Sequence, residues 1–336
     1  QVGRLLYQEV IQASTEISDS MSSAKLFQTF TEFHRVKTWN TIMMCWKRKF
    51  STSPTVGSSD IGLSYTTYPD KDNSIIDPKK KPIIFLHGLF GHKGNLHSVS
   101  KHLADDGRKV ITYDARNHGD SEHTLEMNYH NMAEDLDGLL EDLSLSTAIV
   151  MGHSMGGKTA MNFSLTKPDK VSALIVADVN PGKGPGIDEL VKYARAMKDV
   201  KIAAGTSLVQ ARQQAQIQLS STVANRAVLQ FLLTNLRQFE EGGVGWRNNL
   251  DAFLNSSSDI EGFPVQTSPF KKPTLFVFGE NSEHYRVHDA NKIRAIFPEA
   301  EITAIKDAGH FVHADQPLEF VRIVKQFLQK HDGSSS

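Results

Sequence analysis

Short, continuously apolar segments alternate with amphipathic segments along the chain from about residue 60. An apolar run of this kind is typical of a strand buried on both faces, and apolar side chains three or four residues apart indicate a helix. Strands that alternate with helices predict an α/β fold, a parallel sheet covered on both faces. The predicted strands are residues 61–68, 82–86, 109–113, 147–151, 171–177, 273–278 and 301–305, and the predicted helices are residues 95–104, 129–143, 156–165, 290–297 and 318–329.

The pattern changes after residue 180, where a long polar stretch has helical periodicity and no clear strand. We therefore expect a helical cap inserted between two parts of one α/β core. Consecutive glycines in this stretch, at 242 and 243, predict a turn. The expected cap helices are residues 188–198, 206–219 and 224–239; the expected organisation is a core over 55–180 and 266–331, a cap over 181–265 and a disordered tail over 332–336.

Composition narrows the class of protein. The chain has 336 residues, with 37 Lys and Arg against 38 Asp and Glu, so no basic excess indicates a nucleic-acid partner. Its longest apolar runs are much shorter than the ~20 residues needed to cross a bilayer, so we expect no transmembrane segment. Cys45 is the only cysteine, which excludes an intrachain disulfide and fits a reducing compartment.

The N-terminal region, residues 1–54, has a different composition. Six basic residues and one acid lie between Met21 and Pro54, where Ser and Thr are frequent and apolar residues recur at helical spacing. A basic, acid-poor, amphipathic segment of this kind is typical of a mitochondrial transit peptide, with translation starting at Met21 or Met43. Residues 48–51 resemble a matrix-protease cleavage site, so we expect the mitochondrial matrix as the location and matrix proteins as possible associates.

One motif predicts a nucleophile. The pentapeptide at residues 152–156, Gly-His-Ser-Met-Gly, follows a predicted strand and opens a predicted helix. This context is that of a nucleophile elbow, a tight turn that presents the hydroxyl of Ser154 at the carboxyl edge of the sheet. Glycines two positions before and after the serine leave room for the turn, and the helix N-terminus offers free N–H groups to an oxyanion.

The same segment has a second interpretation. Residues Gly152 to Thr159 match the phosphate-loop pattern G-x-x-x-x-G-K-[ST], again between a strand and a helix. In a nucleotide-binding protein Lys158 would contact phosphate. We favour the nucleophile elbow, because it accounts for the motifs around Leu89 and His310 described next, whereas a phosphate loop does not. A non-catalytic binding protein on the same fold is a further alternative, since fold does not fix function.

Two distant segments supply partners for Ser154. Leu89, in His-Gly-Leu-Phe-Gly after an apolar strand, is placed to give one oxyanion N–H, and Met155 is placed to give the other. His310 follows the last predicted strand, late in the chain, where a general base is expected. Its neighbour His313 is expected to pack beside it.

The acid of the triad has several candidates. It must accept a hydrogen bond from the second ring nitrogen of His310. We favour Asp178, because it follows an apolar strand and is therefore expected at the carboxyl edge beside Ser154. Asp251 is an alternative in the cap, and Glu283 is a weaker one in the turn after residue 278, which holds no Asp.

Taken together these motifs resemble a known family. The chain is similar to the α/β-hydrolase domain-containing protein 11 group of mitochondrial serine hydrolases and their small bacterial esterase relatives, over about residues 60–331. The resemblance implies the α/β-hydrolase fold with a helical cap and a serine esterase or lipase-like activity. The motifs that carry it are His87-Gly-Leu-Phe-Gly91, Asp114-Ala-Arg-Asn-His-Gly119, Gly152-His-Ser-Met-Gly-Gly-Lys-Thr-Ala160, Trp246-Arg-Asn-Asn-Leu250 and Ala308-Gly-His310.

The expected activity is hydrolysis of carboxylic esters, acyl lipids or thioesters through an acyl-enzyme at Ser154. The expected partner is a small acyl ester or lipid. The 14 histidines show no metal-binding spacing such as H-E-x-x-H, so we expect no metal and no cofactor.

Overall fold

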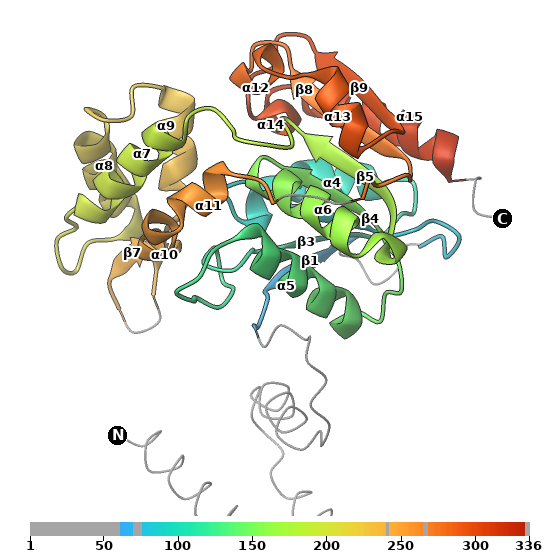
Figure 1. The fold of residues 1–336 in the computed structure, drawn as a ribbon. Coiled ribbons are helices and arrows are strands. Elements are labelled where there is room, and N and C mark those ends of the chain that lie inside the picture. Colours follow the sequence, from blue (N-terminus) through green and yellow to red (C-terminus); the bar gives the residue numbers. More distant parts are fainter. Residues whose placement is uncertain (1–60, 70–75, 240–241, 265–267, 333–336) are drawn as a thin grey trace, which may run out of the picture. The chain divides into compact units, whose positions relative to one another are not determined.

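A seven-stranded sheet forms the centre of the unit Gly57–Ser336, with the strand order β1-β3-β2-β4-β5-β8-β9 (Figure 1). β1 runs antiparallel to β3 and the other neighbours are parallel, which confirms the predicted α/β class. The strands are β1 (Tyr65–Tyr68), β2 (Ile83–Leu86), β3 (Val110–Tyr113), β4 (Ala148–His153), β5 (Val171–Ala177), β8 (Thr274–Gly279) and β9 (Ala300–Ile305).

This computed structural model describes residues 61–69, 76–239, 242–264 and 268–332. The predicted N-terminal extension, residues 1–54, lies outside the described residues. So do residues 333–336 of the predicted tail. Asp332, assigned to that tail from the sequence, follows the last helix and forms an ion pair with Arg108.

Helices cover both faces of the sheet because successive residues of each central strand point to opposite sides. In β2, Ile84 and Leu86 pack into the cluster formed with α5 and α6, whereas Ile83 and Phe85 pack into the cluster formed with α4 and α15. No helix in the described ranges is long and apolar enough to cross a bilayer. The core helices are η1 (Lys93–Leu96), α4 (His97–Ala104), α5 (Tyr129–Asp142), α6 (Met155–Thr166), η2 (Pro168–Lys170), α12 (Glu283–Arg286), α13 (Ala290–Ile296), α14 (Val312–Asp315) and α15 (Pro317–His331).

The first strand is shorter than predicted. Alternation extended over residues 61–68, but the strand begins at Tyr65, where pairing with Tyr113 of β3 starts. Residues before it are held by other contacts: the Ser64 N–H donates to the Ser121 hydroxyl, and the Gly62 N–H donates to the carboxylate of Glu122. These residues therefore precede the strand and are not part of it.

The segment between β5 and β8 is mostly helical, and Figure 1 shows it in yellow and orange beside the sheet. The expectation that it holds no strand was wrong, because it contains a short antiparallel hairpin. Its elements are α7 (Ile187–Asp199), α8 (Leu208–Leu219), α9 (Arg226–Leu233), β6 (Leu236–Gln238), β7 (Val244–Trp246), α10 (Leu250–Asn255) and α11 (Ser257–Glu261).

The hairpin replaces the second half of a helix predicted over residues 224–239. The buried Asn235 ends α9 there, and its amide donates to the Leu232 carbonyl and to the Phe90 carbonyl of the core. Gly242 and Gly243 have positive φ angles of 94° and 83°, which close the hairpin turn. A long-range contact therefore overrides the local helical periodicity.

Candidate active site

Ser154 occupies a turn that the two flanking glycines make possible. The residue lies between the end of β4 and the start of α6, with φ 53° and ψ −117°. A Cβ atom on Gly152 would lie 2.1 Å from the Gly156 carbonyl oxygen, and one on Gly156 would lie 2.5 Å from the His87 carbonyl oxygen. Any side chain at either position would therefore force the strand and the helix apart.

Three side chains from distant segments form a chain of hydrogen bonds. The Ser154 hydroxyl lies 3.1 Å from His310 Nε2, and His310 Nδ1 lies 2.7 Å from a carboxylate oxygen of Asp178. His310 belongs to the loop between β9 and α14, and Asp178 follows β5. Asp178 is fully buried, whereas 36% of the His310 side chain is exposed. The base is thus accessible from one side and held by a buried acid on the other.

Asp178 is held by two further donors. The Gly279 N–H donates to one carboxylate oxygen at 2.9 Å, and the Ser282 hydroxyl donates to the other at 2.5 Å. Because each oxygen accepts at least one hydrogen bond, the carboxylate plane is fixed relative to His310. Ser282 was missed in the sequence; the available signal was a hydroxyl in the turn after residue 278, which holds no Asp although triad acids commonly stand there.

The other two acids lie elsewhere. Asp251 forms an ion pair with Lys198 and 65% of its side chain is exposed. It lines an open hollow of ≈ 490 Å³ whose lining residues include none of the serine, histidine and buried acid described above. Glu283 begins α12 with its side chain exposed. Of the three candidate acids, Asp178 is the one that is hydrogen-bonded to His310 among the described residues.

The two predicted oxyanion donors flank the serine. Met155 is the first residue of α6, so its N–H has no partner inside the helix. Leu89 follows Gly88, where an added Cβ would lie 3.2 Å from Ser154 Cβ. Neither N–H donates to a protein acceptor in the part of the chain that the structure describes. Both amides are therefore without a protein acceptor among the described residues, one directly after Ser154 and one directly after Gly88.

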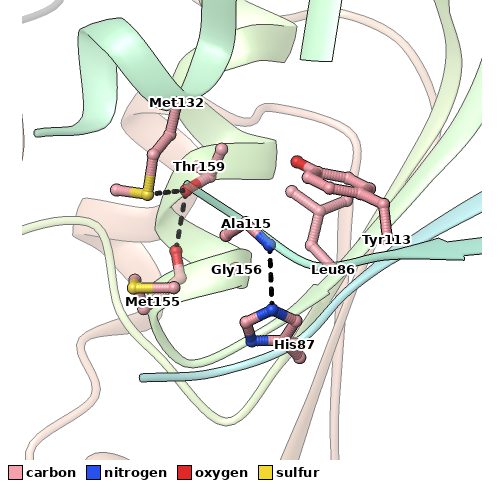
Figure 2. Close-up of a pocket in the computed structure, with 8 residues that line it drawn as sticks. All are labelled: Leu86, His87, Tyr113, Ala115, Met132, Met155, Gly156 and Thr159. Atoms are coloured by element: carbon pink, nitrogen blue, oxygen red, sulfur yellow. Dashed lines mark hydrogen bonds between the residues drawn. The ribbon is translucent and has the colours of Figure 1, made fainter. Parts of the chain in front are cut away.

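Behind the elbow lies a small void of ≈ 10 Å³, bordered mainly by apolar side chains. Figure 2 shows His87 at its edge, with its ring hydrogen-bonded to the backbone of Ala115. His87 Nε2 accepts from that N–H, and Nδ1 donates to the Gly88 carbonyl at 2.8 Å. The space is about the size of one water molecule, and His87 braces two loops here.

Lys158 does not adopt the role of a phosphate-loop lysine. Its ammonium group donates to the carbonyls of Glu261 and Gly262 at 2.6 and 2.8 Å, at the end of α11. Helix α6 already begins at Met155, so residues 152–157 do not form the loop that cradles phosphate. Burial lowers the pKa of Lys158 to about 8. Lys158 therefore links α6 to the end of the inserted segment. The phosphate-loop interpretation was wrong.

Several histidines around the site are buried in uncharged form. Burial lowers the pKa of His118 to about 3 and the pKa values of His284 and His313 to about 4. Burial also lowers the pKa values of His87 and His153. Within the described ranges, no group of three or more His, Cys, Asp or Glu side chains could hold a metal ion.

Comparisons with known proteins identify the family to which the chain is similar. The sequence model of the alpha/beta hydrolase fold family matches residues 81–200. The chain is 42% identical over 273 residues to the sn-1-specific diacylglycerol lipase ABHD11 of Danio rerio, covering 81% of this chain and 84% of that one. It is 32% identical over 247 residues to the Esterase YbfF of Escherichia coli (strain K12), covering 74% and 92%.

A solved structure is also similar. The Marine microorganism esterase superposes with a TM-score of 0.72 at 35% sequence identity, covering 80% of this chain and 99% of that chain. The similarity therefore extends over the sheet and the inserted segment together.

We predict that stability falls as the solution is acidified below pH 6.5. A histidine whose pKa is lower in the folded state than in the unfolded state is protonated at higher pH in the unfolded chain. Acidification therefore favours the unfolded state, and the contribution of each neutral histidine to the free energy of unfolding is complete above pH 6.5 and is lost towards pH 4. Between pH 6.5 and 5 each such histidine accounts for at most about 2 kcal/mol. We expect Tm, measured by circular dichroism, to fall by more than about 5 °C over this range. An unchanged Tm would contradict the neutral assignment.

Proposed function

Because this chain belongs to the α/β-hydrolase family, we propose that it is a serine hydrolase that cleaves acyl esters through a covalent intermediate on Ser154. The observation that carries the proposal is the pair of hydrogen bonds from Ser154 to His310 and from His310 to Asp178, at 3.1 and 2.7 Å. An ordered serine, imidazole and buried carboxylate is the arrangement that activates a hydroxyl for acyl transfer.

In the first step His310 Nε2 takes the proton of the Ser154 hydroxyl as the oxygen attacks the ester carbonyl. Asp178 accepts the hydrogen bond from Nδ1–H, so it fixes the ring tautomer and stabilises the imidazolium that forms. The N–H groups of Leu89 and Met155 stabilise the tetrahedral oxyanion. One such donor is typically worth about 3–4 kcal/mol in the transition state.

Collapse of the tetrahedral intermediate breaks the ester C–O bond. His310 returns its proton to the leaving alkoxide, and the acyl group stays on Ser154. A water molecule then gives a proton to His310 and attacks the acyl carbonyl, which releases the carboxylic acid and restores the Ser154 hydroxyl. The half-exposed edge of His310 leaves a route for this water.

We assign acyl lipids as the substrate class, with the sn-1 ester of a diacylglycerol as the first candidate. The ABHD11 relative is a diacylglycerol lipase by name, and the bacterial relative is an esterase. Apolar side chains border the base: the ring centroid of Phe311 lies 5.5 Å from that of His310 and 4.9 Å from that of Phe231 on α9. An acyl chain beside this pair would be removed from water, which favours binding.

The assignment of the acid predicts a contrast between two matched variants. Asp178→Asn should lower kcat by about 10³–10⁴-fold, because the amide cannot hold His310 in the correct tautomer. Asp251→Asn should stay within about twofold of the wild type, since its exposed ion pair with Lys198 borders a hollow whose lining does not include the base. Steady-state hydrolysis of p-nitrophenyl butyrate measures both. A larger loss in Asp251→Asn would make Asp251 the acid.

The substrate class predicts activity on lipid esters. A panel of p-nitrophenyl esters of rising chain length, followed by diacylglycerols, should show hydrolysis that Ser154→Ala abolishes together with labelling by a fluorophosphonate probe. Chromatography of the products should show fatty acid released from sn-1 before sn-2. Folded protein that hydrolyses none of these esters would contradict the proposed function.

The proposed location is the mitochondrial matrix, where matrix proteins would be its neighbours. The support is the basic, acid-poor composition between Met21 and Pro54. The catalytic domain itself carries no such address, since a bacterial relative shares it. We expect the full chain to enter isolated mitochondria and to be shortened there, whereas a chain starting at residue 55 should stay outside. Equal import of both would refute the location.

A further inference from the structure

The residue before the nucleophile lies between the base and the turn that holds Gly88. We propose that His153 is a positioning residue whose ring N–H holds the backbone of the base His310 against the strand that carries Ser154. This inference rests on the proposed function. It concerns a residue that neither binds substrate nor exchanges a proton in the steps above.

The contact joins a buried ring to a partly buried loop. His153 is the last residue of β4 and 2% exposed, and its Nε2 lies 2.8 Å from the carbonyl oxygen of His310. Its ring centroid is 4.7 Å from that of His310 and 4.6 Å from that of His313. His310 is therefore held in two ways: its side chain contacts the Ser154 hydroxyl, and its backbone carbonyl contacts the ring of the residue before Ser154.

The partner of Nε2 defines the tautomer. A carbonyl oxygen only accepts, so His153 Nε2 must carry the proton. The ring is neutral, because burial and the adjacent His313 and His310 hold the pKa of His153 well below its usual value. Nδ1 then carries a lone pair rather than a hydrogen.

On its other side the His153 ring packs against the turn that holds Gly88 and Leu89, here called the oxyanion turn. A Cβ atom on Gly88 would lie 2.8 Å from His153 Nδ1, so only glycine fits there without a shift of the ring. Because Leu89 follows Gly88, the position of the ring also limits how close the oxyanion N–H can come to Ser154. The His153 ring thus lies between the loop that carries His310 and the oxyanion turn, and it sets the distance between them.

The alternative is that His153 only fills space at the end of β4. The two roles differ in what they require: space filling needs volume, and positioning needs a donor at the place of Nε2. Glutamine carries an N–H₂ group at about that distance from the backbone, whereas the shorter asparagine does not reach it. The two amides are chemically alike but differ in volume, so His153→Phe, which keeps a ring without the donor, completes the comparison.

The test compares His153→Gln with His153→Asn in the full chain. We expect His153→Gln to keep kcat for p-nitrophenyl butyrate within about threefold, and His153→Asn to lose about 10–100-fold with KM unchanged, because displacement of a base by a fraction of an ångström slows chemistry without weakening binding. The Ki of phenylboronic acid, which forms a tetrahedral adduct on an active serine, should rise in proportion to the fall in kcat/KM.

Tm identifies variants that fail to fold. His153→Phe keeps a ring without the donor and should show the same loss of kcat as His153→Asn, because space filling alone would leave its kcat unchanged. Equal kcat in the glutamine and asparagine variants, whether high or low, would overturn the proposal, as would a loss of kcat without a change in the boronate Ki. Absence of ester hydrolysis by the folded wild type would instead refute the proposed function.

Discussion

The register of three parallel strands fixes the site. His153 of β4 pairs with Ala177 of β5, and Ala177 pairs with Val277 of β8. The next residues along the first two strands are Ser154 and Asp178, so they emerge at the same edge of the sheet. A shift of one residue in this register would turn a strand's side chains to the opposite face and separate the serine from the acid.

Backbone strain is concentrated at the same edge. Ser154, Asp178 and Phe90 have positive φ angles of 53°, 51° and 58°, a conformation that costs a non-glycine residue about 1–3 kcal/mol. Packing holds these residues there, since Gly152 and Gly156 admit the elbow and the donors on Asp178 fix its carboxylate. The strain directs the hydroxyl and the carboxylate away from the strands and towards His310, and preorganisation of this kind supports the chemistry we propose.

Much of the core could be predicted from the sequence because its signals are local. The run at residues 171–177 was predicted with the bounds that β5 has, and the glycine pattern identified Ser154 as a candidate. What could not be predicted depends on distant contacts. Asn235 ends α9 through the Phe90 carbonyl, so the hairpin after it was missed. Ser282 lies beside Asp178 only because β5 and β8 are neighbours, and sequence spacing does not show that.

If the acyl group passes through Ser154, mass spectrometry of protein that is quenched with acid during turnover of a p-nitrophenyl ester should detect it there. We expect a mass increase of one acyl group on the peptide that contains Ser154. Repeating the measurement with Ser154→Ala should show no adduct. An acyl group found on another residue, or turnover with no acylated peptide under conditions where deacylation limits the rate, would exclude a covalent intermediate on Ser154.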